Sequence, residues 1–413
     1  MKVIGIVAEY NPFHNGHLYH IEQAKKQTGA DYVVVILSGN FVQRGTPAII
    51  DKYSRTKMAL ENGADLIFEL PVIYATASAE AFAFGAVSLL HSLGFIDSIC
   101  FGCETPDLTL FEPIADLFLQ EPDDYKDFLY TYQKQGFSFP VARSKATVSF
   151  FASTQYASCL DTIEEILSNP NNILAIEYIK ALKQLDSPIT PVPILRKNAG
   201  YHDIALSGTI CSATAIRTAY SEKNKISVLQ TFLPKSCYDI LEHAENKTFP
   251  IDADDFSSLL YYKLLQTTDF SPYTDISIDF ANRLEKIKNY EYSFTDYANA
   301  LKTKDMVYTR ICRNLMHILL DLKNINYKIQ PGYLRLLGFK KSASHLLKKG
   351  KDADFSPIVP VITKTADAKK LLSSSAYAQF EKDVMAAHLY NHICHQKYGF
   401  TAKNEYMHGP VIL

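Results

Sequence analysis

The residues of this chain best suited to chemistry are two histidines in the sequence His14-Asn15-Gly16-His17. Imidazole N–H groups donate hydrogen bonds to phosphoryl oxygens, and such bonds strengthen as negative charge accumulates in a transition state. Gly16 lets a phosphate come close to the backbone, because it carries no side chain. Two histidines at this spacing are by themselves more often packing or surface residues, so the surrounding elements decide between the two interpretations.

A predicted strand and a predicted helix hold the two histidines. Residues 3–7 are an apolar run rich in β-branched side chains, which is typical of a buried strand. Asn11 and Pro12 predict a turn, and a helical pattern starts near Gly16, so both imidazoles fall at the first helical turn. A helix N-terminus has unpaired N–H groups and about half a positive charge. This geometry suits attack on the α-phosphate of a nucleotide.

The composition is that of an ordinary soluble protein. The chain has 413 residues, 47% hydrophobic and 21% charged, enough for two or three packed domains. We expect a cytoplasmic protein without a membrane partner, because no run of 18 apolar residues is free of charges and the chain begins with a strand and a loop rather than a leader. Seven cysteines, an odd number without regular spacing, predict free thiols in a reducing compartment.

Short apolar runs alternate with helical patterns from residue 31 to about residue 240. This βαβα order predicts an α/β fold with a Rossmann-like, doubly wound parallel sheet, whose ligand lies outside the carboxyl ends of the strands. Side chains that follow strands are therefore the candidates for function. The expected strands are residues 31–37, 66–70 and 98–101, and the expected helices are residues 52–62 and 77–92.

Two loops follow predicted strands and carry such candidates. The loop of residues 38–45 contains Gln43 and Arg44, which we expect to face the acyl group or the nucleophile. Gly102, after the strand at 98–101, would let adenine or ribose lie against the backbone. The alternatives are a solvated loop and a simple turn. Their positions at strand ends favour function.

Three further motifs fit a nucleotide site. Asn171 and Asn172 open a helical pattern, where Asn is more often a cap than a ligand. Arg196 and Lys197 directly follow the apolar run 191–195, a suitable place for a phosphate or ribose contact. In the third motif, hydroxyl groups at a helix start precede an arginine by one turn, which suits β- and γ-phosphates, although alone it would be an ordinary helix cap. Its residues are Ser212, Thr214 and Arg217.

Two patterns resemble metal sites but do not predict one. Cys100 and Cys103 form a CxxC pair without the second pair that a zinc site needs, so we expect buried thiols. His388, His392 and His395 share one helical face, but no carboxylate or cysteine is predicted beside them, which favours a polar surface. No metal ligand is therefore assigned.

The last third of the chain is basic and mainly helical. Strand alternation ends near residue 245, so we expect a catalytic domain of residues 1–243 and a helical, RNA-binding domain of residues 244–413. Residues 302–351 hold twelve Lys/Arg against two acids, in a chain of net charge −2. Tyr308, Tyr333 and Phe339 are interleaved with these charges, which suits phosphate contact and base stacking. The candidate RNA contacts, which become tRNA contacts if the resemblance described next holds, are Arg310, Arg313, Arg335, Lys340 and Lys341.

Several segments together resemble a known family. The N-terminal motif resembles the HxGH signature of the nucleotidylyltransferase superfamily, and the chain as a whole resembles the bacterial tRNA(Met) cytidine acetate ligases. Ser212 to Arg217 resembles the ISSTxIR motif of that superfamily, with Ala213 where serine is frequent and Ala215 where lysine is frequent. The matching segments read GIVAEYNPFHNGHLYH, SGNFVQRG, PNNIL, GYHD, SATAIR and YLRLLGF.

The resemblance implies a two-step reaction. Acetate attacks the α-phosphate of ATP to give acetyl-adenylate and pyrophosphate, and the acetyl group then passes to the exocyclic amine (N4) of the wobble cytidine of elongator tRNA(Met). Magnesium bridging the phosphates is expected from the chemistry, and DNA is not an expected partner. His14, His17, Gln43 and Arg44 are the implied catalytic residues. The implied ATP contacts are Val7, Ala8, Glu9, Tyr10, Asn11, Pro12, Phe13, His14, Asn15, Gly16, His17, His20, Gly102, Asn171, Asn172, Arg196, Lys197, Ser212, Thr214 and Arg217.

Two other classes of protein remain open at this point. A small-metabolite nucleotidylyltransferase or carboxylate–amine ligase would need only the N-terminal half, and the basic, aromatic C-terminal half argues against it. A non-catalytic RNA-binding protein with a relic nucleotide fold is disfavoured by the retained His14, Gly16 and His17. The residues alone do not distinguish acetate from another short carboxylic acid.

Overall fold

The computed structural model describes residues 1–196, 209–304, 306–347 and 358–413. Its central sheet has the strand order β10-β8-β5-β2-β1-β6-β7, with β9 paired to β8. The neighbours from β5 through β2, β1 and β6 to β7 run parallel, and β8 runs antiparallel to β5. The strands are β1 (Val3–Ala8), β2 (Tyr32–Ser38), β5 (Leu66–Leu70), β6 (Ser98–Cys103), β7 (Thr190–Leu195), β8 (Leu334–Phe339), β9 (Val361–Ile362) and β10 (Val411–Ile412).

Helices cover both faces of this sheet. Side chains alternate along β2, so Val33 and Val35 pack in a core that includes α1 and α2, while Val34 and Ile36 pack in the core that includes α4. Burial on both faces explains why the strands are nearly continuous apolar runs. The α/β prediction with a parallel, doubly wound sheet is confirmed. The helices are α1 (Asn15–Thr28), α2 (Lys52–Glu61) and α4 (Ala79–Leu93).

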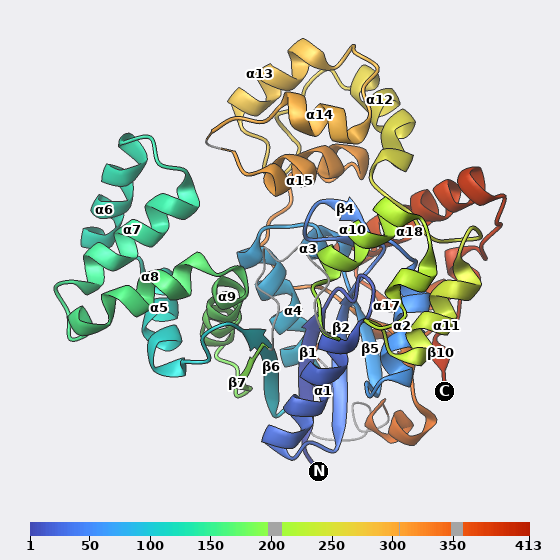
Figure 1. Ribbon diagram of the computed structural model, residues 1–413, viewed down its shortest axis with the longest axis horizontal. Coiled ribbons are helices and arrows are strands. Elements are labelled where there is room, and N and C mark those ends of the chain that lie inside the picture. Colours follow the sequence, from blue (N-terminus) through green and yellow to red (C-terminus); the bar gives the residue numbers. More distant parts are fainter. Residues whose placement is uncertain (197–208, 305, 348–357) are drawn as a thin grey trace.

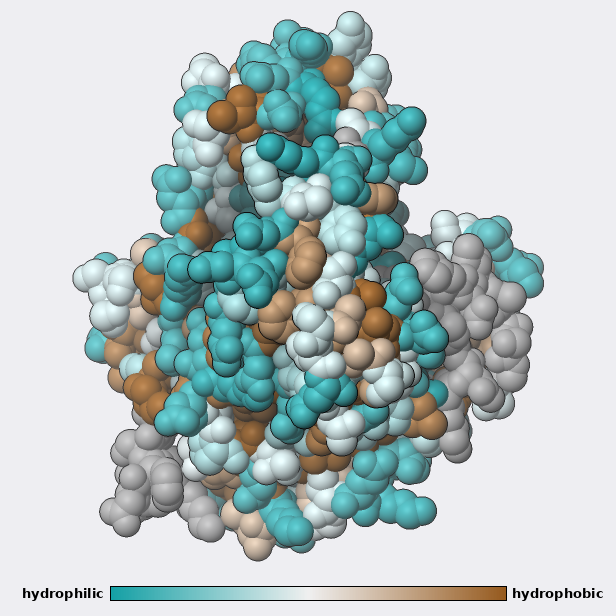
Figure 2. Space-filling view, turned by 90° about the vertical axis from the view of Figure 1, so that its left-hand side faces the viewer, coloured by the Kyte–Doolittle hydropathy of each residue, from teal (hydrophilic) through white to brown (hydrophobic). Residues whose placement is uncertain are grey.

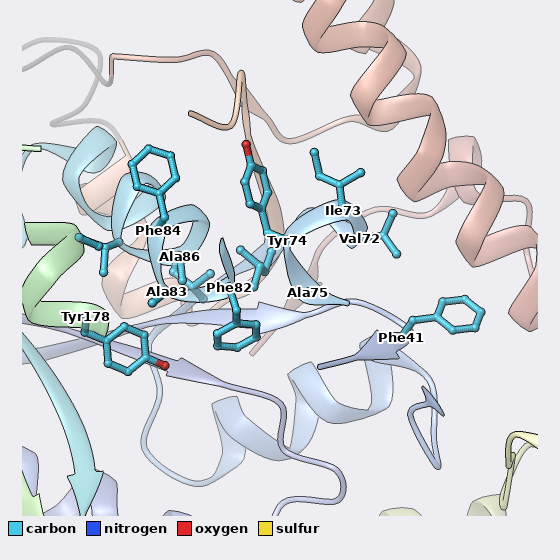
Figure 3. Packing of buried hydrophobic residues seen from close by; sticks show 14 of the residues in the cluster. Phe41, Val72, Ile73, Tyr74, Ala75, Phe82, Ala83, Phe84, Ala86 and Tyr178 are labelled. Carbon is cyan, nitrogen blue, oxygen red and sulfur yellow. The ribbon is translucent and has the colours of Figure 1, made fainter. Parts of the chain in front are cut away.

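The core on the α4 side also fixes the loop that follows β2. Figure 3 shows Phe41 projecting from this loop, with Tyr74 of α3 (Val72–Ala75) and Phe82 of α4 on the same side of the sheet. Phe41 is fully buried, and its ring centroid lies 6.3 Å from that of Tyr390. Burial of an aromatic ring of this size anchors the short hairpin in which it lies. The hairpin is β3 (Phe41–Val42) and β4 (Thr46–Pro47), and Tyr390 belongs to α18 (Ser374–Tyr398).

Two groups of helices extend away from the sheet in Figure 1, although α9, the last helix of the first group, packs against α4, β6 and β7. One is inserted between β6 and β7, and the other, in the upper part of the view, lies in the C-terminal half. Figure 2 faces the first group; hydrophobic side chains there form small groups among hydrophilic ones. The first comprises α5 (Leu108–Gln120), α6 (Asp123–Lys134), α7 (Phe139–Phe151), α8 (Leu160–Ser168) and α9 (Pro170–Gln184), and the second α12 (Ser257–Gln266), α13 (Ile278–Ile287), α14 (Phe294–Ala300) and α15 (Tyr308–Leu319).

The chain returns to the sheet after the expected domain boundary. Strands β8, β9 and β10 all come after residue 243, and Leu66 of β5 pairs with Phe339 of β8. The sheet is therefore not confined to residues 1–243, although residues 244–413 are mainly helical. The other α-helices described are α10 (Ala213–Lys223), α11 (Lys235–Ala244), α17 (Ala368–Leu371) and α18.

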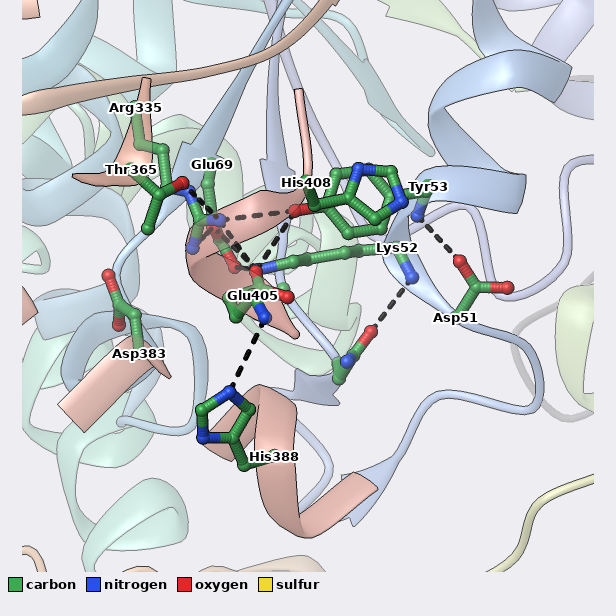
Figure 4. A network of polar contacts seen from close by, with 12 residues as sticks. Asp51, Lys52, Tyr53, Glu69, Arg335, Thr365, Asp383, His388, Glu405 and His408 are labelled. Atoms are coloured by element: carbon green, nitrogen blue, oxygen red, sulfur yellow. Dashed lines mark hydrogen bonds and ion pairs between the residues drawn. The ribbon is translucent and has the colours of Figure 1, made fainter. Parts of the chain in front are cut away.

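A buried network of charges joins the C-terminal segments to the sheet (Figure 4). The ammonium group of Lys52 lies 2.7 Å from Glu69 and 2.6 Å from Glu405, and the guanidinium of Arg335 lies 3.0 Å from Glu69 and 2.6 Å from Glu405. Burial opposes the charge of Arg335, but the carboxylates of Glu69 and Glu405 outweigh burial and raise its pKa. Such a closed set of pairs tolerates burial, whereas removing one member leaves an uncompensated charge.

No helix in the described part of the chain is both long enough and apolar enough to span a bilayer.

Candidate active site

A pocket opens at the carboxyl ends of β1, β2, β6 and β7, where a parallel sheet is expected to bind its ligand. It brings together segments from residue 6 to residue 217. Unpredicted residues such as Tyr19, Phe82 and Tyr178 also line it. The predicted residues that line it are Val7, Ala8, Glu9, Tyr10, Asn11, His14, Gly16, His17, His20, Gln43, Arg44, Gly102, Asn171, Arg196, Ser212, Thr214 and Arg217.

Four other predicted residues do not line this pocket, and a fifth, Lys197, lies outside the described residues. Pro12 and Phe13 are buried beneath the turn, so direct ATP contact by Phe13, which is fully buried, is ruled out in this arrangement. Asn15 has its amide engaged: Nδ2 donates to the carbonyls of Thr209 at 2.9 Å and Thr231 at 3.0 Å. Asn15 therefore ties α1 to the segments around α10. The fourth residue is Asn172.

His14 and His17 form a capping box at the start of α1. Nδ1 of His14 accepts from the Gly16 N–H at 3.0 Å, and Nδ1 of His17 accepts from the His14 N–H at 3.2 Å. The two rings stack, with centroids 3.7 Å apart. An imidazole nitrogen that accepts a backbone N–H carries no proton, so the neutral ring carries its proton on Nε2. Both Nε2–H groups are thereby available as donors.

Burial keeps these imidazoles neutral. The pKa of His14 is lowered to about 3 by burial, with smaller contributions from the cations Arg196 and Arg217. The pKa of His17 is lowered well below its ordinary value, first by burial and then by His14. The pKa of His20 is lowered to about 4, again mainly by burial. At neutral pH the site therefore presents neutral donors, and its positive charge comes from arginines.

The motif of Ser212, Thr214 and Arg217 combines a helix cap with a place at the pocket. Ser212 is the N-cap of α10, and its Oγ accepts from the Ala215 N–H at 3.1 Å. Arg217 donates through Nη1 to the Asn11 carbonyl at 2.7 Å and through Nη2 to Thr214 Oγ1 at 3.3 Å. Arg217 therefore also fixes the turn that precedes His14. The N-termini of α1 and α10 face the same pocket and favour an anion there.

A third helix start, that of α9, is held by Glu104. Its carboxylate accepts from Asn171 Nδ2 and from the Asn172 N–H at 3.2 Å. In return, Asn172 Oδ1 accepts from the N–H groups of Glu104 at 2.9 Å and Thr105 at 3.1 Å. Asn172 is thus not the N-cap of α9, which is Asn169, but ties the end of β6 to α9. The side chain that lies over Gly102 is that of Arg196: a Cβ at Gly102 would come within 3.3 Å of its Cγ.

Arg55 is the main residue of the site that the sequence did not indicate. Its fully buried guanidinium donates to the carbonyls of Glu9 at 2.7 Å, Ser38 at 2.9 Å and Ile50 at 3.0 Å, and also to that of Gly39. These bonds hold the ends of β1 and β2 in one arrangement. A charged residue in a helical pattern normally predicts an exposed side chain, so periodicity gives no signal for it.

The predicted tRNA contact of Arg335 is wrong. Its side chain is 2% exposed and is held by Glu69 and Glu405, so it has no surface from which to reach a phosphate. Tyr333, expected to stack on bases, is 1% exposed and donates its hydroxyl to Asp383. The rest of the segment YLRLLGF, residues 334–339, forms strand β8 rather than a basic surface.

The other predicted tRNA contacts do not form one patch. Arg310 is exposed on α15, and Arg313 is half-buried on the same helix. Lys340 and Lys341 follow β8, whose last residue pairs with Leu66 at the amino end of β5. Lys340 also lies 3.5 Å from Asp65. Because β8 runs antiparallel to β5, its carboxyl end lies beside the amino end of β5. These lysines therefore lie at the end of the sheet opposite the pocket.

The cysteine and histidine patterns have no role at the pocket. Cys100 and Cys103 are buried free thiols, as expected, and burial raises the pKa of each to about 12. His392 and His395 are exposed on α18, and His388 Nε2 accepts from the Glu405 N–H at 3.4 Å. Within the described ranges, no group of three or more His, Cys, Asp or Glu residues is placed to hold a metal ion.

The family model described as HIGH Nucleotidyl Transferase matches residues 1–405. The chain belongs to this family. Relatives named tRNA(Met) cytidine acetate ligase are 40% identical in Thermoanaerobacter sp. (strain X514), over 94% of this chain and 95% of the relative, and 37% identical in Acetivibrio thermocellus, over the full length of both. The resemblance that the motifs indicated is therefore confirmed.

Solved structures of a protein from Thermotoga maritima are similar to this chain over its full length. The crystal structure of Thermotoga maritima TmcAL without ligand superimposes with a TM-score of 0.92, at 30% identity and over the full length of both chains. A crystal structure of the same protein bound with alpha-thio ATP gives a TM-score of 0.91, also at 30% identity and full coverage. The whole architecture, including the helical groups and β8, is thus shared.

Proposed function

We propose that this HIGH nucleotidyl transferase is an ATP-dependent ligase that activates acetate as acetyl-adenylate and acetylates N4 of the wobble cytidine of elongator tRNA(Met). The observation that carries the proposal is the pair of neutral Nε2 donors of His14 and His17 at a helix N-terminus. The full-length similarity to proteins named tRNA(Met) cytidine acetate ligase supports the choice of acyl group and acceptor. Substrates of this kind place the reaction in the cytoplasm.

The first step needs positioning and stabilisation of charge. A carboxylate is a poor acylating agent because its oxygen does not leave, and joining that oxygen to the α-phosphate of ATP makes it part of a good leaving group. As acetate attacks, charge grows on the α-phosphoryl oxygens, where the Nε2–H groups of His14 and His17 donate. The N-termini of α1 and α10, with Arg196, hold the phosphates. No covalent enzyme intermediate is required.

Magnesium would enter this site with ATP. Magnesium in nucleotide sites is commonly bound by one or two carboxylates together with substrate phosphates and water. Glu9 is the only carboxylate among the described residues that line the pocket, so the donor set fits an ion carried by the phosphates better than a protein cage. Such an ion neutralises phosphate charge, while the residues named above orient the nucleotide.

We assign tRNA binding to the helices of the C-terminal half. The hairpin β3–β4, whose loop brings Gln43 and Arg44 to the pocket, packs against α15, because Gly45 lies directly on the backbone of Cys312 and Arg313. A tRNA held along α15 would therefore have a loop beside the pocket. We therefore propose that residues 1–243 activate acetate and that residues 244–413 bind tRNA, although both parts contribute strands to the central sheet.

The decisive experiment supplies purified protein with ATP, isotopically labelled acetate and elongator tRNA(Met), and analyses the tRNA nucleosides by mass spectrometry. Labelled N4-acetylcytidine is expected, together with acetate-dependent release of pyrophosphate. Pyrophosphate release that depends on another small amine, without modified tRNA, would instead support a small-metabolite carboxylate–amine ligase. RNA binding without pyrophosphate release would contradict an enzyme altogether.

A further inference from the structure

The pocket contains one residue that an anionic first step does not need. Glu9 is the only carboxylate among its described lining residues, whereas Arg44, Arg196 and Arg217 supply positive charge. ATP and acetate are both anions, so a carboxylate beside them raises their energy unless it serves another chemical group. The second substrate of the proposed reaction, an aromatic amine, is such a group.

Glu9 is held in a defined position. Its Oε1 accepts from the Gln43 N–H at 2.9 Å, and its own carbonyl accepts from buried Arg55 at 2.7 Å. Among the described residues, no hydrogen-bond donor reaches its second oxygen, Oε2. One acceptor is therefore fixed at the pocket and remains available.

An unused donor accompanies this acceptor. Nε2 of Gln43 is buried, and it has no hydrogen-bond partner among the residues that the structure describes. Gln43 lines the same pocket, and its backbone is the group that holds Glu9. A buried amide without a partner costs free energy, which a ligand acceptor at this place would recover. The site thus offers a carboxylate acceptor and an amide donor from two residues that the bond between the Gln43 N–H and Glu9 Oε1 holds together.

We propose that Glu9 and Gln43 together recognise the cytosine base that receives the acetyl group, an inference that rests on the proposed function. The Watson–Crick edge of cytosine presents an N4 amine donor beside the N3 acceptor. The Glu9 carboxylate accepts from N4, and Gln43 Nε2 donates to N3. Uracil would place a carbonyl oxygen against the carboxylate and an N–H against the amide donor, so the pair selects cytosine over uracil.

The same carboxylate completes the transfer step. N4 attacks the carbonyl carbon of acetyl-adenylate, and a C–N bond forms. The bond between that carbon and the phosphate oxygen breaks, and AMP leaves with the electron pair. The surplus proton on N4 passes to the carboxylate of Glu9, which is thus a catalytic residue of the second step. A positioned general base of this kind contributes about 100-fold to 10,000-fold.

The test separates the two steps in Glu9→Gln. This change keeps the oxygen that accepts from Gln43 but removes the base. We expect single-turnover transfer from acetyl-adenylate to tRNA to fall by about 100-fold or more. Acetate-dependent ATP–pyrophosphate exchange should fall by less than about tenfold. Competition by a tRNA with uridine at the wobble position should become about tenfold more effective relative to cytidine, because the repelling carboxylate is gone.

Glu104→Gln is the matched control. Glu104 lies behind Asn171 and Arg196 on the nucleotide side, so this substitution should lower exchange and transfer in parallel. Equal losses of both reactions in Glu9→Gln, or a raised magnesium requirement for exchange, would show that Glu9 serves ATP or its metal and would overturn the inference. Unchanged transfer would overturn it as well. A wild-type protein that forms acetyl-adenylate but no acetylcytidine would overturn the proposed function itself.

Discussion

The two imidazoles of the HNGH sequence act through the nitrogen that the backbone leaves free. Each Nδ1 accepts a backbone N–H within the first turn of α1, so each Nε2 carries a proton that points out of the capping box. The same bonds set the ring positions, and the rings of Tyr10 and Phe13 pack against His17 at centroid distances of 4.8 Å and 5.5 Å. The histidines therefore have a structural role as caps and a proposed catalytic role as donors, and a substitution can separate the two.

His14→Asn separates cap from donor. Asn is among the best N-cap residues, so it should keep the bond from the Gly16 N–H and leave the free energy of unfolding within about 0.5 kcal/mol of wild type. It has no donor in the place of imidazole Nε2, and kcat for acetate-dependent pyrophosphate exchange should fall by about 100-fold. His14→Ala should lose about 1 kcal/mol of stability in addition. Normal kcat in the asparagine variant would remove His14 from catalysis.

Buried histidine should make the protein less stable in mild acid. The pKa of His20 is about 4 in the folded protein, against about 6.5 when unfolded, so the unfolded state binds more protons between these values. The free energy of unfolding contributed by His20 is intact above pH 6.5 and is lost as the pH falls, by up to about 2 kcal/mol between pH 7 and pH 5. Urea titrations of wild type and His20→Gln at both values test this. Parallel losses in the two proteins would contradict it.

At the scale of single elements, the sequence predicted most of the sheet and its helices. The expected strand at 66–70 is β5, and the expected helices at 52–62 and 77–92 correspond to α2 and α4. These elements carry their signal in local periodicity. Local periodicity does not reveal the position of β8 in the sheet. Its apolar run contains Arg335, and it forms a strand because it pairs with β5 and because carboxylates far away in sequence neutralise Arg335. Likewise, no local pattern marks Arg55 as buried.

The residues of the site could be predicted where a sequence motif contains them. They could not be predicted where their role depends on contacts between segments far apart in the sequence. The HNGH turn, the loop with Gln43 and the helix start at Ser212 were all placed at the pocket. The roles of Glu104 and Asn172 were missed, because they depend on how the end of β6 meets the start of α9. A capping position read from sequence says which side chains lie at a helix start, but not which other segment they bind.

The contact between the β3–β4 hairpin and α15 should depend on Gly45. Gly45 has φ +74°, and a Cβ there would overlap the backbone nitrogen of Arg313 and the carbonyl carbon of Cys312. Gly45→Ala should therefore lower the free energy of unfolding by about 2–4 kcal/mol, from backbone strain together with overpacking. It should also lower kcat, because Gln43 and Arg44 lie in the displaced hairpin. Urea denaturation and pyrophosphate exchange measure the two effects.

Gly29→Ala is the control for this substitution. Gly29 has φ +66° and nothing within 4 Å of an added Cβ, so its alanine variant carries the backbone strain alone. It should cost about 1–2 kcal/mol and leave kcat unchanged. Equal costs for the two variants would mean that the hairpin moves away from α15 without penalty.

At the scale of the whole molecule, the basic stretch of residues 302–351 is divided by the fold. Strand β8 runs from the buried charge network near Glu69 to the far edge of the sheet, so it carries Lys340 and Lys341 away from the pocket. Arg310 stays on α15, next to the hairpin that reaches the pocket. The net charge of the stretch is therefore a poor guide to its binding surface. We therefore expect the exposed cations on the pocket side to hold a tRNA whose wobble base enters the site.

Paired substitutions on opposite edges test this division. Lys304→Gln with Arg310→Gln removes two exposed cations beside α15, and Lys26→Gln with Lys341→Gln removes two exposed cations at the opposite edge. The first pair should weaken tRNA binding and reduce the slope of log affinity against log salt by about 1–2. The reason is that binding releases fewer counterions from the RNA when fewer phosphates are contacted. The second pair has the same charge change and should leave the slope within about 0.3 of wild type, since the wobble base at the pocket keeps the bound loop away from that edge. Titration of labelled tRNA at several salt concentrations gives both slopes. Equal reductions in the two variants would show that the tRNA spans both edges, and a reduction in the second pair alone would move the binding surface to the ends of β8.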